Sequence, residues 1–522
     1  MRSRSYLYLT VFVAGMTTLA VEFTTSRMLQ TVFGTSNIVW ANVIGLVLLF
    51  LTLGYFIGGR LADRAPAAGS FYWLVTAAGF CAVFFLLLTS VVLRAAASAL
   101  AALNVGALLA SLAVVLLALA LPITLLGTIS PFAVRLAVRD VAEAGRVSGR
   151  IYAVSTWGSL LGTYLPVLVV IPLAGSRAAA VLFGSLLLVI GLGGLWRSRR
   201  RSAARALALP LILAGPVALW SQGPLKAYPG QIFEAESSYN YIQVIRAGDC
   251  NYLLLNEGQA YHSYYCDGGR VPRISVWSIM LAGPAFNDPA AYRPPHNLAV
   301  IGLAAGTVAK QFSQAYGPQP IDGIELDPAI VDAGRRYFAM DEPNLRVIVG
   351  DGRFQLNRLN RRYDLITLDA YKVPYIPWHM TTREFFSEVK AYLREQGVLA
   401  INVGRVPGDR RLVNAISATL LEVFPSVHTV DVPLALNTIL FATVQDTTSS
   451  NLTTNLAALE PQTEPLLRAI LTTAAENLTP SMASDVIFTD ERAAVETMID
   501  SIVIGYFLRE GPAGLPGLPV PE

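Results

Sequence analysis

The stretch Ile301-Gly302-Leu303-Ala304-Ala305-Gly306 decides the fold of the C-terminal half of this 522-residue chain. It follows directly on the hydrophobic run 297–301. Small residues at such a point let a strand turn tightly into a helix, and they let a ligand approach the backbone and the helix N-terminus. The stretch therefore predicts a nucleotide-type fold with an adenosine-type ligand, bound at a turn that contains Gly302, Ala304 and Gly306.

Strand and helix patterns alternate around this turn. We expect helices over 305–316, 328–338, 352–360 and 382–395, and strands over 297–301, 321–325, 345–349, 363–368 and 397–402. Such alternation predicts a parallel, doubly wound sheet with right-handed crossovers. Thr381 and Glu384 have the spacing of a capping box at the start of the last of these helices.

Three acids follow successive predicted strands, at the edge where ligands of such sheets bind. Glu325 comes about 20 residues after the glycine turn, where a carboxylate accepts hydrogen bonds from both ribose hydroxyls. Asp351, followed by Gly352, is suited to accept one from an adenine amine, and Asp369 faces the place of chemistry. Taken singly, each acid is better explained as a helix N-cap or a turn residue. Their order together with the glycine turn favours a site.

Hydrophobic residues make up 54% of the chain and charged residues 14%, and the mean hydropathy is +0.50. The excess lies before about residue 222, and a membrane span needs roughly 20 apolar residues. Six runs reach that length, and a seventh, 206–220, is short and contains two prolines: the six are 6–26, 37–58, 71–93, 104–127, 151–173 and 178–196. We predict a transmembrane helical domain over 1–222, with about 6–7 spans.

This domain predicts a multi-pass protein of a bacterial-type inner (plasma) membrane, with the lipid bilayer as its partner. The net charge of +3 comes mostly from arginines between apolar runs, which is typical of topology signals, so no nucleic-acid partner is expected. The side of the membrane depends on whether 206–220 spans it. Cys250 and Cys266 flank a predicted strand and either form a disulfide in an oxidising compartment or are free thiols. A homo-oligomer stays open as an alternative.

The remainder of the chain is predicted in four parts. Residues 226–290 form a small β lid with antiparallel strands at 239–245 and 252–255 and a turn at Gly248-Asp249. Residues 291–445 form the Rossmann-like nucleoside-binding domain, 446–510 a helical extension, and 511–522 a disordered tail.

Residues from about 230 to 445 resemble the spermidine synthases, aminopropyltransferases built on the S-adenosylmethionine-dependent methyltransferase fold. Five ordered motifs carry the resemblance: Glu236–Val244, Leu255-Asn256-Glu257-Gly258-Gln259, Ile324–Asp327, Gly350-Asp351-Gly352 and Tyr363–Asp369. The N-terminal half is similar to that of membrane-fused relatives of the family. The resemblance implies an α-helical multi-pass membrane domain followed by an α/β Rossmann-like, methyltransferase-type domain with a small N-terminal β lid.

The resemblance also implies a small-molecule sulfonium nucleoside as substrate, either S-adenosylmethionine or its decarboxylated form. Asp369 and Tyr371 are the predicted catalytic residues, and Gln259 joins the glycine turn, Glu325, Asp351 and Gly352 in binding the nucleoside. Predicted substrate-binding residues are Gln243, His262 and Lys372. No metal is expected, because the four histidines and three cysteines have no metal-ligand spacing.

The departures from the family pattern concern the acids that hold cationic amines. Ala305 stands where the family's glycine loop has an aspartate, Lys372 where a second acid follows Asp369, and Val276-Trp277-Ser278 where the family has Tyr-His/Gln-Glu. A dicationic acceptor needs carboxylates to replace its hydration. Putrescine is therefore a poor candidate acceptor, and loss of the loop acid removes a group that repels the carboxylate of intact S-adenosylmethionine.

These departures predict cleavage of the C–S bond with release of 5′-methylthioadenosine and closure of homoserine lactone by the substrate's own carboxylate. One alternative is an aminopropyltransferase that makes spermidine or a related polyamine. Another is a membrane transporter or sensor with a nucleoside-binding domain.

Overall fold

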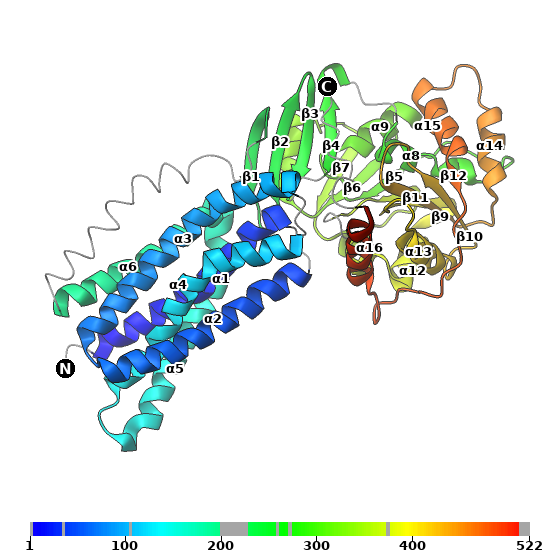
Figure 1. Ribbon diagram of the computed structural model, residues 1–522. Helices are drawn as coiled ribbons and strands as arrows, with labels where there is room; N and C mark the ends of the chain where they lie inside the picture. The colour runs from blue at the N-terminus through cyan, green and yellow to red at the C-terminus, as the bar shows by residue number, and fades with distance from the viewer. Residues whose placement is uncertain are drawn as a thin grey trace. The chain divides into compact units, whose positions relative to one another are not determined.

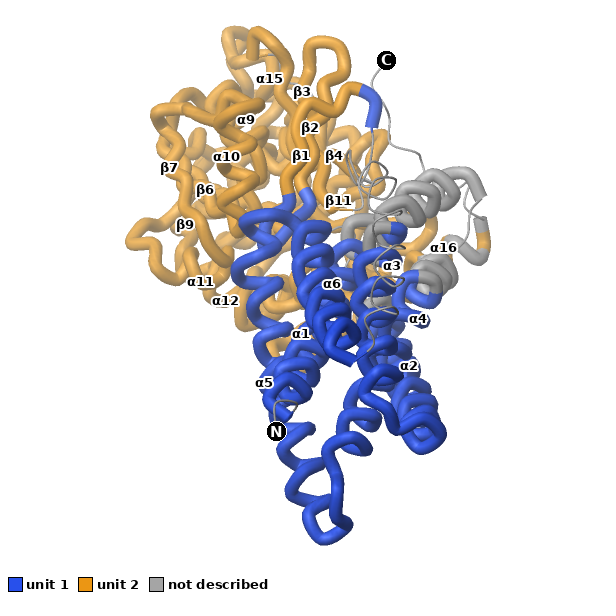
Figure 2. Tube along the Cα trace, turned by 90° about the vertical axis from the view of Figure 1, so that its left-hand side faces the viewer, with its two compact units in different colours: residues 1–229, 236–241 blue, residues 230–235, 242–522 orange. Residues whose placement is uncertain are grey.

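The chain divides into two compact units, shown in different colours in Figure 2. The first contains residues 1–229 and 236–241, and the second contains residues 230–235 and 242–522. The computed structural model describes residues 4–33, 37–103, 107–198, 228–256, 260–269, 274–371 and 376–510. The short apolar run 206–220 and the tail 511–522 lie outside these ranges.

Long helices make up the described part of the first unit (Figure 1): α1 (Arg4–Phe33), α2 (Asn37–Arg64), α3 (Ala68–Leu103), α4 (Ala107–Ala137), α5 (Ala144–Leu165) and α6 (Ile171–Ser198). Among the described residues, five segments are long and apolar enough to cross a membrane. The fifth, 141–198, contains both α5 and α6, joined by a π-helix at Pro166–Val170. At Gly175, φ is 81° and ψ is 166°, which interrupts the helix within this segment.

Glycines let these helices approach one another closely. Gly158 of α5 lies against α1, where an added Cβ would be 1.9 Å from the carbonyl oxygen of Phe12. Gly54 of α2 lies against α4, where a Cβ would be 2.3 Å from the carbonyl oxygen of Thr124. Small residues at such crossings allow backbone contact, which stabilises helix pairs in a bilayer.

We expect Gly158→Ala to lower the free energy of unfolding of the full chain in detergent by about 1–3 kcal/mol, and with it the unfolding temperature, because the new methyl group forces α5 away from α1. Gly149 is the matched control, since it is exposed on the same helix and has no atom within 4 Å of an added Cβ. Gly149→Ala should leave stability unchanged or raise it slightly. Equal unfolding temperatures for the two variants would contradict the packing described for α1 and α5.

A four-stranded antiparallel sheet forms the predicted lid. Its strands are β1 (Gln231–Glu236), β2 (Tyr241–Ala247), β3 (Cys250–Leu255) and β4 (Tyr261–Cys266), in that spatial order. Gly248 has a φ of 59° in the turn between β2 and β3, as the predicted Gly248-Asp249 turn requires. Cys250 and Cys266 lie opposite each other on β3 and β4 and form a disulfide.

An eight-stranded mixed sheet forms the centre of the second unit (Figure 1), in the order β12-β10-β11-β9-β8-β5-β6-β7. Five of its strands are parallel neighbours, as predicted: β9 (Leu393–Gly404), β8 (Tyr363–Leu368), β5 (Leu298–Ile301), β6 (Ile321–Glu325) and β7 (Leu345–Val349). The fold is therefore Rossmann-like.

The rest of the sheet corrects the all-parallel prediction. β10 (Ser426–Asp431) and β11 (Asn437–Thr443) are joined by residues 432–436 only, and so short a connection can join only antiparallel strands. β11 also pairs antiparallel with β9, so it lies between β9 and β10. β12 (Leu478–Thr479) adds a short antiparallel edge.

Helices cover both faces of this sheet, because its central strands are buried on both sides. Val300 of β5 belongs to a core with α9 (Thr307–Tyr316) and α15 (Pro465–Glu476), and Ile301 to a core with α12 (Arg383–Ala391) and α13 (Arg411–Leu421). The remaining helices are α8 (Val276–Met280), α10 (Pro328–Tyr337), α11 (Gly352–Leu356), α14 (Ser449–Ala457) and α16 (Val495–Glu510).

Two helix predictions were wrong in detail. α11 ends at Leu356, short of the predicted 360, and α12 ends at Ala391, short of the predicted 395, because β9 begins at Leu393. α12 is capped by Thr382, whose side chain accepts a hydrogen bond from the backbone N–H of Phe385, and not by Thr381. The Thr381 hydroxyl donates instead to the carbonyl of Trp378, within the preceding turn.

Candidate active site

The glycine turn has the backbone conformation that its small residues predict. Gly302 has a φ of 90°, and an added Cβ there would lie 2.4 Å from the carbonyl oxygen of Asp369. Gly306, with a φ of 89°, caps α9. Ala304 also adopts a left-handed conformation, with a φ of 48°, which is uncommon for a residue with a side chain. The turn therefore brings the ends of β5 and β8 into direct backbone contact.

Glu325 ends β6 and points back to the glycine turn. Its two carboxylate oxygens accept hydrogen bonds from the backbone N–H groups of Ala304, at 2.8 Å, and of Asp327, at 3.0 Å. The residue is 7% exposed, and burial raises the pKa of Glu325 to about 7, against the opposing effect of these hydrogen bonds. Glu325 is thus a carboxyl group that gains and loses its proton near neutral pH.

Asp351 follows β7, as predicted, and caps α11 by accepting a hydrogen bond from Phe354 N–H at 2.9 Å. Its other oxygen lies 3.3 Å from His379 Nε2. Gly352 is buried, and an added Cβ would be 2.5 Å from a methyl group of Ile301. The helix-cap explanation therefore accounts for one of the two oxygens of Asp351, and its role toward a nucleoside stays a prediction.

Asp369 ends β8, and each of its carboxylate oxygens accepts one hydrogen bond. Trp277 Nε1 donates to one oxygen at 2.8 Å, and Asn402 Nδ2 donates to the other at 2.8 Å. Burial raises the pKa of Asp369, and the hydrogen bonds from Asn402 and Trp277 act in the opposite direction. These two donors fix the orientation of the carboxylate and favour its ionised form.

Neither Trp277 nor Asn402 was predicted as a site residue. Trp277 lies on α8, and its ring packs against the rings of Tyr261 and Tyr264 from the lid. Asn402 lies near the carboxyl end of β9, the strand beside β8. The rule that selected the three acids, namely position at the carboxyl end of a parallel strand, would have selected Asn402 if it had been applied to amides.

Tyr371 is held by the backbone of β9. Its hydroxyl donates to the carbonyl of Asn402 and accepts from the N–H of Gly404, each at 2.8 Å. Burial and the nearby charge of Asp369 raise the pKa of Tyr371 well above its usual value. The structure thus gives Tyr371 a neutral hydroxyl that braces the segment after Asp369, and its predicted catalytic role stays a prediction.

Two predicted substrate-binding residues lie in the lid. The Gln243 side chain is 1% exposed and donates to Gln231 Oε1 at 2.8 Å. His262 is the extra residue of a β-bulge, because Leu253 pairs with Ser263 whereas Leu254 pairs with Tyr261. Bulges redirect side chains next to active sites. Burial lowers the pKa of His262 to about 4, so its imidazole is neutral at pH 7.

The lid reaches the glycine turn through Ser263. Its hydroxyl accepts a hydrogen bond from Ala305 N–H at 3.0 Å, and the neighbouring Tyr264 N–H donates to Thr307 Oγ1 at 3.1 Å. Sequence reasoning missed this contact. The other predicted residues of the site, Gln259 and Lys372, lie outside the described residues.

The strand order explains which of these groups come together. β6, β5 and β8 are adjacent and parallel, so Glu325, the glycine turn and Asp369 follow one another along the same edge of the sheet. Asp351 follows β7, one strand further out. A nucleoside along this edge would meet the carboxylate of Glu325 at one end and that of Asp369 at the other.

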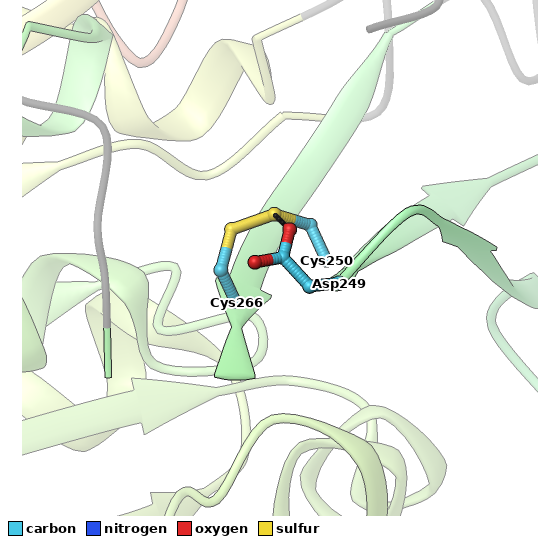
Figure 3. A group of neighbouring side chains, drawn as sticks. All are labelled: Asp249, Cys250 and Cys266. Carbon is cyan, nitrogen blue, oxygen red and sulfur yellow. Dashed lines mark hydrogen bonds between the residues drawn. A yellow bond between two sulfur atoms is a disulfide. The ribbon is translucent and has the colours of Figure 1, made fainter. Parts of the chain in front are cut away.

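One group of described side chains has the proximity of a metal site: Asp249, Cys250 and Cys266 (Figure 3). The two sulfur atoms are joined to each other, as Figure 3 shows, so neither is a thiolate that could bind a metal. This group lies where β3 begins and β4 ends.

Comparison with known proteins shows what the domain is similar to. Residues 281–455 match the family described as Spermine/spermidine synthase domain. Over 214 residues the chain is 34% identical to a probable polyamine aminopropyl transferase of Bifidobacterium longum. The aligned residues are 40% of this chain and 46% of that protein. It is 34% identical over 159 residues to a polyamine aminopropyltransferase of Vibrio vulnificus, which covers 30% of this chain and 50% of that one.

The chain thus spans about half the length of these curated relatives. Among solved structures, a probable spermidine synthase from Corynebacterium glutamicum aligns with a TM-score of 0.38 at 20% identity, covering 50% of this chain and 99% of that one. Residues 281–455 of the second unit are therefore similar to spermine/spermidine synthase domains, and they lie in a Rossmann-like sheet with the ordered acids described above.

Proposed function

We propose that this domain binds an S-adenosylmethionine-type sulfonium nucleoside, preferably the decarboxylated form, and transfers its aminopropyl group to an acceptor. The observation that carries the proposal is Asp369, a buried carboxylate held by Trp277 and Asn402 beside the glycine turn. The names of the relatives, which are polyamine aminopropyl transferases, support the same chemistry.

The reaction needs alignment more than activation, because the sulfonium is already an excellent leaving group. The acceptor's nitrogen lone pair attacks the methylene carbon beside the sulfur, and the C–S bond breaks as the C–N bond forms. The sulfur leaves as neutral 5′-methylthioadenosine, and the nitrogen loses one proton. Asp369 accepts that proton, since its fixed orientation suits it to this role and burial makes it a stronger base.

Glu325 holds the nucleoside in this proposal. Its carboxylate already accepts two backbone N–H groups, and a carboxylate oxygen has room for more than one hydrogen bond. Ribose hydroxyls would donate to the remaining positions. Because these donors stabilise the ionised form, nucleoside binding would release the proton that Glu325 carries below about pH 7.

A second candidate is cleavage of intact S-adenosylmethionine without an acceptor, closing homoserine lactone. The observation that favours it is Ala305, which is 1% exposed in the glycine turn and donates its N–H to Ser263. No carboxylate occupies this position to grip the amine of the decarboxylated substrate or to repel the carboxylate of the intact one.

We further propose that the first unit is embedded in a bacterial inner membrane, with the second unit on the oxidising side. The apolar length of its helices supports the first part, and the disulfide between Cys250 and Cys266 supports the second. Disulfides persist outside the reducing cytoplasm.

Asp369→Asn should reduce turnover by roughly 10²- to 10⁴-fold, because an amide cannot accept the proton. The full chain in detergent is incubated with each sulfonium compound, with and without putrescine or spermidine, and products are identified by mass spectrometry. Amine-dependent 5′-methylthioadenosine supports transfer, and its formation from intact S-adenosylmethionine alone supports lactone closure.

Asp364→Asn is the matched control, since Asp364 is the second residue of the same strand and pairs with exposed Arg394. It should retain turnover. Binding of both sulfonium compounds without any product would leave a sensor or transporter as the explanation, and undiminished turnover by Asp369→Asn would remove the role of that residue.

Nucleoside affinity should rise between pH 6 and pH 8. The pKa of about 7 leaves Glu325 mostly protonated at the lower pH, and only its ionised form accepts both ribose hydroxyls. Titration calorimetry with 5′-methylthioadenosine should show a gain of up to about tenfold across this range. Glu325→Gln should bind more weakly with no such dependence, whereas the exposed Glu422→Gln should behave as the wild type. A flat profile for the wild type would argue against ribose contact by Glu325.

The disulfide can be tested in native membranes. The chain has three cysteines, and Cys81 is free and buried in α3. After denaturation, we expect an alkylating reagent to modify one cysteine without reductant and all three with it, as counted by mass spectrometry. Modification of three cysteines without reductant would place the second unit on the reducing side.

A further inference from the structure

A cavity of about 560 Å³ lies in the second unit, at the carboxyl end of β9. Arg405, just after β9, lines one wall, and residues 431–436, the turn between β10 and β11, line another. The third wall is formed by Glu476 to Thr479, where α15 passes into β12. None of these residues belongs to the glycine turn or contacts Asp369 through its side chain.

Two arginines share one carboxylate in this cavity wall. Arg410 Nη1 donates to both oxygens of Asp431, at 2.9 and 2.8 Å, and Thr438 donates to the same carboxylate at 2.6 Å. Arg405 Nη2 lies 3.4 Å from Asp431. Among the residues that line the cavity, Arg405 is positively charged, and Asp431 and the exposed Glu476 are negatively charged. Arg410 does not line the cavity but binds both oxygens of Asp431, so Arg405 has only a distant share of that carboxylate.

The side chain of Arg405 has hydrogen-bond donors that are not used. Its side chain is only 18% exposed, yet it makes no hydrogen bond to any residue within the described ranges, and its Nε–H is buried without a partner. Buried guanidinium groups normally donate several hydrogen bonds, because an unsatisfied buried donor costs free energy. A half-buried guanidinium with unused donors at the wall of a cavity suits an anion.

We propose that this cavity binds the anionic group of a small molecule, a carboxylate or a phosphate, through Arg405. The planar guanidinium matches the two oxygens of either group. The inference does not rest on the proposed function, because anion binding requires no turnover.

The cavity also adjoins the support of Asp369. The backbone N–H of Arg405 donates to the carbonyl of Leu436. The side chain of Asn437, the residue after Leu436, donates to Asn402 Oδ1 at 2.9 Å. Asn402 in turn donates to Asp369. Two side-chain hydrogen bonds therefore separate the cavity wall from the catalytic carboxylate.

The test is anion binding to the full chain in detergent, measured by titration calorimetry with inorganic phosphate and with malonate, at an ionic strength held constant with chloride. Arg411→Gln is the matched control, because Arg411 is 55% exposed and pairs with Asp409 away from the cavity. We expect saturable binding of phosphate or malonate by the wild type and by Arg411→Gln, and affinity lower by roughly tenfold or more in Arg405→Gln.

The two titrations separate the two ligand classes. The anion that binds with higher affinity, phosphate or malonate, shows whether the cavity prefers a phosphate or a carboxylate. If Arg405→Gln does not fold, as judged by its thermal unfolding, Arg405→Lys replaces it. That variant keeps the charge and loses the planar fork, so weaker binding than in Arg411→Gln supports the proposal. Equal affinity in the Arg405 and Arg411 variants, or no saturable binding of either anion by the wild type, overturns it.

Discussion

The site depends on one steric constraint, the contact between the backbone of Gly302 and the carbonyl of Asp369. No side chain fits between them, since even a Cβ would lie 2.4 Å from that oxygen. This contact fixes the spacing between the ends of β5 and β8, and with it the position of the carboxylate relative to the glycine turn. The hydrogen bonds from Trp277 and Asn402 then orient a group whose place is already set.

The charge of this site lies on two buried carboxyl groups. Glu325 and Asp369 both have raised pKa values because water is excluded, and both are kept from full neutralisation by neutral donors rather than by cations. Backbone N–H groups serve Glu325, and an indole and an amide serve Asp369. A carboxylate held by neutral donors keeps its negative charge available to a cationic substrate, which a salt bridge would have consumed.

Much of the fold could be predicted because its signals are local. The bounds of β6, β7 and β8 agree with the predicted ranges. Turn residues limit β6 and β7, with Pro320 before β6 and Gly350 after β7. Glu325 was found for the same reason, by its spacing from the glycine turn. Trp277 could not be found in this way, because it lies 92 residues from Asp369 and only the packing of α8 brings the two together. β10 and β11 were not predicted at all, and the place of β11 between β9 and β10 depends on tertiary pairing.

The cross-link in the lid ties β3 to β4. Cys250 begins β3 and Cys266 ends β4, so sulfur joins the two strands at the ends that the chain itself does not connect. The two strands form a covalent ring and cannot be peeled apart. The bulge at His262 lies inside that ring. A displacement of this hairpin would therefore carry the His262 imidazole with both strands and would break the hydrogen bond between Ala305 and Ser263.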